Sequence, residues 1–166
     1  MRVSPVAWAF SDLATVMIEA EKSASITHNH PEGIKGAVSV ASAIFMARTG
    51  ESKANIRTFI ESQFGYSLAR SIPMIRAVNR FDETCQGSVP EAITAFLEST
   101  DFESAIRLAI SIGGDSDTIA SIAGAIAEAF YNDIPGEIRE NTIRLLPDDL
   151  LKTLIDFSSH NYLKKN

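Results

Sequence analysis

The sequence Ile112-Gly113-Gly114-Asp115-Ser116-Asp117-Thr118-Ile119-Ala120 decides how the rest of the chain is arranged. Two glycines lead into two carboxylates and a hydroxyl, and an apolar segment follows as far as Phe130. Apolar residues recur in that segment at steps of three and four, which predicts a buried helix of about four turns. The glycines allow the backbone a sharp entry, and Asp115 or Ser116 is a suitable N-cap for the helix.

The acidic start of this helix has two interpretations. Most strings of this kind are N-caps, but a cap needs one oxygen, and here Asp115, Asp117 and Thr118 offer three. Their flanks are apolar, and Mg²⁺ prefers oxygen ligands, so the second interpretation is a magnesium site at the edge of the core. Residues i and i+2 of a regular helix point about 200° apart, so both carboxylates can meet one metal cluster only at the irregular start. The EF-hand pattern does not fit, because Ile119 and Ala120 occupy its fifth and sixth positions.

Capping signals predict further helices along the chain. Ser11 is a suitable N-cap for a helix that runs to about Ala24, and Ser52 begins another that Gly65 ends. For residues 66–87 the sequence pattern predicts short helical pieces joined by loop. Later helix starts are predicted at Ser88, in a capping box with Glu91, and at Asp101, Pro135 and Pro147.

The helix predicted from Pro31 to about Thr49 is almost entirely small or apolar, which indicates close packing on several sides and a central position. The two predicted C-terminal helices carry residues expected to face inward: Ile138, Ile143, Leu145, Leu146, Leu150, Leu151, Leu154, Ile155 and Phe157. No stretch alternates with a period of two, so no strand is predicted. The sequence therefore predicts a single all-α domain over residues 1–166, a compact, orthogonally packed bundle of roughly eight helices.

The composition excludes several classes of protein. The net charge of −6 and the pI near 5.0 argue against a broad nucleic-acid or anionic-membrane surface. Cys85 is the single cysteine, so no intrachain disulfide or cysteine zinc cluster is expected, as is typical of reducing cytosol. The start of the chain lacks the pattern of a signal peptide, and charged residues interrupt every long apolar stretch. We therefore expect a cytoplasmic protein with no membrane or nucleic-acid partner.

Two histidines, His28 and His30, flank Asn29 in a connection between helices. On their own they are typical of surface or locally hydrogen-bonded residues, and a zinc site is not indicated, because no third nitrogen or sulfur ligand lies nearby. Arg2 carries donors that suit a diphosphate, but we interpret it as a surface or buttressing residue. Cys85 has no adjacent base and is interpreted as a small core or cleft residue.

Three stretches together resemble the ADP-ribosylglycohydrolase family. They are 1–5, then Thr27-His28-Asn29-His30-Pro31-Glu32-Gly33, and 113–120 with the segments 123–125 and 134–135 beyond it. The resemblance implies an all-helical fold and Mg²⁺-dependent hydrolysis of the glycosidic bond between ADP-ribose and a modified protein side chain. It implies two Mg²⁺ ions, with Asp115, Asp117 and Thr118 as metal ligands and His28, with weaker support His30, as residues that bind ADP-ribose.

The resemblance also implies parts that this sequence does not contain. A phosphate loop, further metal ligands and an acidic catalytic residue are expected N-terminal to the matching part, and none stands before Met1. We therefore expect a C-terminal portion of such an enzyme, with the catalytic residue supplied by a missing N-terminal segment or partner chain. An exposed apolar surface is expected where that segment packs. The alternative is a non-catalytic helical module that binds ADP-ribose or a protein partner.

Overall fold

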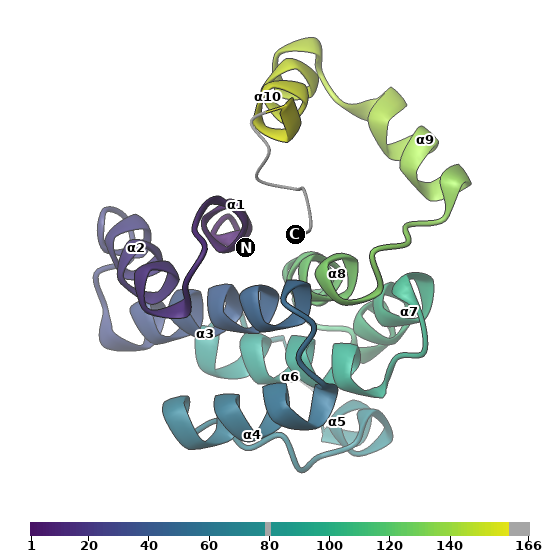
Figure 1. Ribbon diagram of the computed structural model, residues 1–166. Coiled ribbons are helices and arrows are strands. Elements are labelled where there is room, and N and C mark those ends of the chain that lie inside the picture. Colours follow the sequence, from purple (N-terminus) through teal and green to yellow (C-terminus); the bar gives the residue numbers. More distant parts are fainter. Residues whose placement is uncertain (79–80, 160–166) are drawn as a thin grey trace.

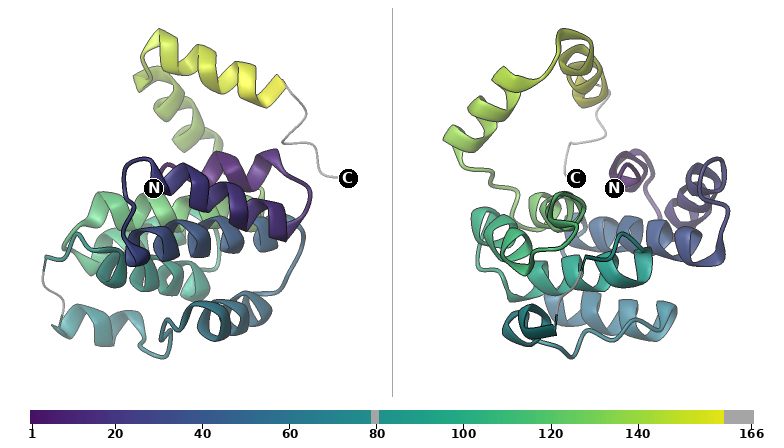
Figure 2. Two further views of the ribbon diagram at one scale, coloured as in Figure 1. Left: turned by 90° about the vertical axis from the view of Figure 1, so that its left-hand side faces the viewer. Right: turned by 180° about the vertical axis from the view of Figure 1, so that it is seen from behind.

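A computed structural model describes residues 1–78 and 81–159, and every regular element among them is a helix. Figure 2 shows the same ribbon from two further sides. The helices in chain order are α1 (Ser4–Ala9), α2 (Leu13–Ser25), α3 (Pro31–Arg48), α4 (Lys53–Phe64), α5 (Ile72–Val78), α6 (Cys85–Glu98), α7 (Phe102–Ile112), α8 (Ser116–Tyr131), α9 (Gly136–Leu145) and α10 (Asp148–Ser159). The all-α prediction is confirmed, with ten helices in the described part in place of roughly eight.

Helix α3 lies at the centre of the bundle and packs against α1, α2, α4, α6 and α8 (Figure 1). Every residue of α3 from Val38 to Ala47 is buried. The small residues of this helix allow its neighbours to approach closely, since a Cβ added at Gly36 would lie 2.9 Å from the Cβ of Cys85 in α6. The predicted central position of this helix is therefore confirmed.

The other large contact group consists of α6, α7 and α8, which pack on one another, while α8 and α6 also pack on α3. Phe96 of α6 is fully buried, and its ring meets that of Phe130 in α8 edge to face, with centroids 5.3 Å apart. The ammonium group of Lys53, at the start of α4, lies 5.0 Å from the Phe96 centroid and donates to the Leu97 carbonyl at 3.2 Å. One cation thus joins the start of α4 to the C-terminal part of α6.

The helix starts follow the predicted capping signals with two exceptions. Ser52 accepts from the backbone N–H of Asn55 at 3.1 Å, and Asp101 forms a reciprocal capping box with Ser104. The N-cap of α2 is Asp12, because its carboxylate accepts from the N–H of Thr15 at 2.8 Å, so the prediction of Ser11 is wrong by one residue.

The predicted start of α6 at Ser88 is wrong by a full turn. Thr84 is the N-cap, and its hydroxyl accepts from the N–H of Gly87 at 3.2 Å. The hydroxyl of Ser88 instead donates to the Thr84 carbonyl at 3.0 Å, and Pro90 lies inside the helix. Thr84 and Ser88 are both suitable N-caps, and the helix begins at the earlier of the two.

The helices α9 and α10 form an arm that stands away from the rest of the molecule in all three views (Figures 1 and 2). Their helical prediction is confirmed, but neither contains a buried residue, so the prediction that their apolar residues face a core is wrong for the described structure. The reason is that neither helix packs closely on the body. The large apolar residues exposed on the arm are Ile143, Leu145, Leu150, Leu154 and Ile155. The predicted packing of a further segment on an apolar surface stays a prediction.

The helices of the described part include none that is both long and apolar enough to cross a membrane.

The Phe96 contact gives a stability prediction. Phe96→Ala removes a fully buried ring between α3's neighbours α6 and α8, and we expect it to lower the free energy of unfolding by about 3–5 kcal/mol in urea titrations. Phe81→Ala is the matched control, because Phe81 is 70% exposed, and its effect is expected to stay within about 0.5 kcal/mol. Equal losses in the two variants would contradict the described core.

Candidate functional site

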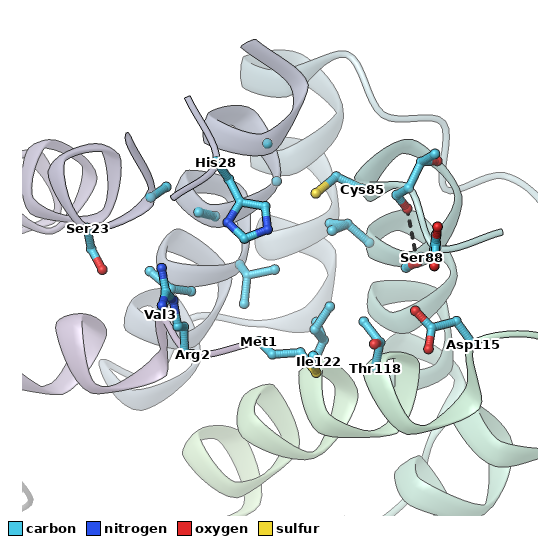
Figure 3. A pocket seen from close by; sticks show the side chains of 18 residues that line it. Met1, Arg2, Val3, Ser23, His28, Cys85, Ser88, Asp115, Thr118 and Ile122 are labelled. Carbon is cyan, nitrogen blue, oxygen red and sulfur yellow. Dashed lines mark hydrogen bonds between the residues drawn. The ribbon is translucent and has the colours of Figure 1, made fainter. Parts of the chain in front are cut away.

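A pocket of about 310 Å³ opens where the ends of several helices meet (Figure 3). Its walls come from the first residues of the chain, the turn between α2 and α3, and the first turns of α3, α6 and α8. The lining is largely apolar, through Val40, Val89 and Ile122, with polar groups at its rim. A volume of this size is within the range of small-molecule sites in proteins.

His28 forms one wall, and its ring points into the pocket in Figure 3. The turn that carries it is fixed by the backbone, since the N–H of His28 donates to the Ala24 carbonyl at 2.8 Å. The first turn of α3 packs directly on this turn: a Cβ added at Gly33 would lie 3.0 Å from the His28 carbonyl oxygen. The side chain is held by the Thr27 hydroxyl, whose oxygen lies 2.8 Å from Nδ1.

Asp115 and Thr118 form another wall of the pocket, at the start of α8 (Figure 3). Gly113 and Gly114 have φ angles of 80° and 64°, a left-handed conformation that favours glycine and turns the chain sharply into the helix. Asp115 occupies the N-cap position, yet its side chain makes no capping hydrogen bond. The N-cap interpretation therefore does not account for its carboxylate, which lines the pocket instead.

Asp117 lies next to this wall but does not line the pocket. Its carboxylate accepts from the N–H of Thr118 at 2.9 Å. A hydrogen bond with the Asp115 side chain, followed by this backbone bond, holds the pKa of Asp117 below its usual range. The roles of Asp115 and Asp117 as metal ligands stay a prediction.

The donor chemistry of these three residues fits a hard cation such as Mg²⁺, because all of it is oxygen. Their number is smaller than a closed site needs: within the described ranges no three or more His, Cys, Asp or Glu side chains gather into a metal-binding group. Within the described residues the predicted cation site thus rests on two carboxylates and one hydroxyl, and it stays a prediction.

His30 is placed differently from His28. It is the N-cap of α3, and its Nδ1 accepts from the N–H of Glu32 at 3.3 Å. It is not among the residues that line the pocket. Its predicted role in binding has no support from this geometry and stays a prediction.

Several pocket residues were not predicted to line a site. Arg2 was interpreted as a buttress, and it both lines the pocket and donates to the Thr27 hydroxyl. Glu83, Thr84 and Ser88 line the pocket from the start of α6, but the sequence indicated Ser88 only as an N-cap, because that start was placed a turn too late. Cys85 lines the pocket as a small cleft residue, as predicted.

Beside the pocket, Tyr66 packs behind Cys85 and is 6% exposed. The ammonium group of Lys35 lies 4.5 Å from the centroid of its ring. Burial, together with the nearby Cys85 and Glu32, raises the pKa of the Tyr66 hydroxyl to about 12. The hydroxyl is therefore neutral at physiological pH.

Comparisons with known proteins agree on one family. A family model described as ADP-ribosylglycohydrolase matches residues 1–162. ADP-ribosylhydrolase ARH3 from Bos taurus is 30% identical in an alignment 178 residues long. The alignment covers 79% of this chain and 48% of that protein. The Homo sapiens ARH3 is 29% identical with the same coverage, and an uncharacterized protein from Archaeoglobus fulgidus is 29% identical over 81% of this chain and 49% of its own.

A solved structure of an ADP-ribosylglycohydrolase-related protein complex has the same fold, with a TM-score of 0.70 at 24% identity. It covers 95% of this chain and 56% of the solved one. The chain spans about half the length of the curated relatives that it matches.

The environment of Tyr66 gives a pH prediction. A hydroxyl whose pKa is raised in the folded state, relative to about 10 in the unfolded state, favours folding below pH 10, and this contribution is lost as the pH rises toward 12. We therefore expect the free energy of unfolding to fall by on the order of 1–2 kcal/mol more in the native protein than in Tyr66→Phe between about pH 9 and pH 11.5. Parallel losses in both proteins would contradict the buried placement of this hydroxyl.

Proposed function

This chain belongs to the ADP-ribosylglycohydrolase family, and we propose that its pocket binds the ADP-ribose part of an ADP-ribosylated protein side chain and serves Mg²⁺-dependent hydrolysis of the glycosidic bond between them. One observation carries the proposal. The pocket brings His28 together with Asp115 and Thr118, although the two stretches lie far apart in the sequence. The stretch that carries His28 was singled out for this chemistry by the family resemblance, and the stretch that carries Asp115 by its residue types and the resemblance together.

The electrostatics of the pocket suit a ligand that carries both phosphates and hydroxyls. The first turns of α3, α6 and α8 all line it, and the N-terminal end of a helix presents free N–H groups and a partial positive charge. Arg2 adds a guanidinium at the rim. Diphosphate oxygens are favoured by such a field, and the apolar walls suit an adenine or ribose face.

The roles of the acidic residues follow from their placement. Asp115, Asp117 and Thr118 would hold Mg²⁺, with Asp115 and Thr118 on the pocket wall. When bound, the ion supplies Lewis-acid polarisation and a water of lowered pKa. The carboxylates themselves present negative charge to a reaction that develops positive charge at the anomeric carbon.

The acidic catalytic residue is not assigned to the described residues. Since the relatives are about twice as long, their activity as whole proteins comes to this chain only as part of the proposal. Arginine is the modified side chain that we would test first. The cytoplasmic location of the protein stays a prediction.

A second function, binding of ADP-ribose without hydrolysis, is favoured by one observation. The described residues provide two carboxylates and a hydroxyl, and a Mg²⁺ ion held by so few protein ligands keeps most of its waters. Such a module would bind the ligand through His28 and the helix ends alone.

We expect release of ADP-ribose from an ADP-ribosylated arginine protein with Mg²⁺, and its loss in excess EDTA. The Asp115→Ala/Asp117→Ala double variant should lower the rate by at least about a hundredfold, because it removes both carboxylates that would hold the ion. Product is measured by chromatography.

The matched control is Asp148→Ala/Asp149→Ala, which removes two adjacent carboxylates from the first turn of α10, outside the pocket. Its rate should equal that of the native protein. Release that persists in EDTA would contradict the metal dependence. No release from folded protein that still binds ADP-ribose would favour the binding module.

A further inference from the structure

A chain of hydrogen bonds runs from Arg2 through Thr27 to His28 at the edge of the pocket. The guanidinium Nη2 of Arg2 donates to the Thr27 hydroxyl oxygen, and that oxygen lies 2.8 Å from Nδ1 of His28. The three residues come from the start of the chain and from the turn between α2 and α3. Arg2 and His28 both line the pocket.

The direction of these bonds follows from the donors available. A guanidinium only donates, so Arg2 occupies a lone pair of the Thr27 oxygen. The Thr27 hydroxyl has one hydrogen, and Nδ1 of His28 is the acceptor that lies within reach of it. With that hydrogen on the Thr27 oxygen, each group donates to the next, and the bonds polarise one another in the same direction. The reverse order, in which Nδ1–H donates to the second lone pair of the Thr27 oxygen, would leave the hydroxyl hydrogen without a partner in this chain of bonds.

The backbone of the turn that carries this ring is fixed, and the three side chains lie at the surface. The backbone of His28 is bonded to Ala24, and the first turn of α3 lies against it at Gly33. With Nδ1 turned to Thr27, the other ring nitrogen, Nε2, is the one left for the pocket into which the ring points (Figure 3).

We propose that Arg2 and Thr27 are positioning residues that fix His28 in its Nε2–H tautomer, so that His28 presents an N–H donor to the pocket. The chemical consequence is specific. A protonated Nε2 donates to an oxygen of the ligand, such as a phosphate or ribose oxygen, and has no lone pair for a metal ion. His28 is thereby assigned to ligand recognition and excluded from cation binding. The identity of the ligand rests on the proposed function, whereas the tautomer does not.

The tautomer is measured directly by ¹⁵N NMR of the histidine side chains in the ligand-free protein. The chain has three histidines, and the His28→Gln variant identifies the signals of His28. We expect the Nδ1 shift of His28 in the range of an unprotonated acceptor and its Nε2 shift in the range of a protonated nitrogen. An Nδ1–H tautomer, or an even mixture, in the native protein would overturn the proposal.

Three variants test whether the relay is the cause. Thr27→Val removes the hydroxyl at nearly constant shape, and Arg2→Met removes the first donor, so both should move His28 toward a mixture of tautomers. Thr27→Ser keeps the hydroxyl and should restore the native tautomer. Thr58→Val, an exposed threonine on α4, is the control and should leave the spectrum unchanged. A native tautomer that persists in both Thr27→Val and Arg2→Met would also overturn the proposal.

Binding supplies the second readout. Calorimetry with ADP-ribose should show about tenfold weaker affinity for Thr27→Val, equal to about 1.4 kcal/mol, and native affinity for Thr27→Ser. Equal affinity of Thr27→Val and the native protein would contradict the recognition role of the relay. If the native protein binds no ADP-ribose, the proposed function fails while the tautomer result stands on its own.

Discussion

The structure depends on the close approach of other helices to α3. Ten consecutive residues of this helix, from Val38 to Ala47, are buried, and most are small. At Gly36 even a methyl group would collide with Cys85 of α6. Because interiors are packed at nearly crystalline density, a helix with such a surface fixes the positions of its neighbours within narrow limits. The position of α8 along α3 is one of the positions fixed in this way.

The pocket is a consequence of that packing. The turn that carries His28 leads into α3, and the turn that carries Asp115 leads into α8, so helices packed side by side bring the two turns to one place. Gly33 and Gly36, which line the pocket, let the turn of His28 and the first turn of α6 approach α3 closely. Fold and site thus rest on the same feature of the sequence, the small residues of α3.

The sequence predicted the elements that local chemistry determines. The small, apolar composition of residues 31–49 sufficed to place α3 at the centre, and the glycines before Asp115 sufficed to predict an irregular helix start. The start of α6 could not be chosen from the sequence, because Thr84 and Ser88 are both good caps and tertiary burial of the intervening turn decides between them. Burial of α9 and α10 was predicted from amphipathic patterns, but a pattern specifies a face and not the surface that covers it.

The site residues divide in the same way, into those that the sequence indicates and those that only the fold brings together. The family resemblance singled out His28, Asp115, Asp117 and Thr118, and three of these four line one pocket. Nothing local to Arg2 indicates that its guanidinium meets Thr27, since that contact joins residues brought together only by the packing of α1, α2 and α3.

The most direct test of the central claim is a crystal structure of the protein with ADP-ribose and Mn²⁺, which replaces Mg²⁺ and is located by its anomalous scattering. The account predicts ADP-ribose in the pocket between His28 and the start of α8, with an oxygen of the ligand at Nε2 of His28 and the Mn²⁺ signal at the Asp115 carboxylate. ADP-ribose bound on another surface, or Mn²⁺ bound away from Asp115 while the ligand occupies the pocket, would contradict it.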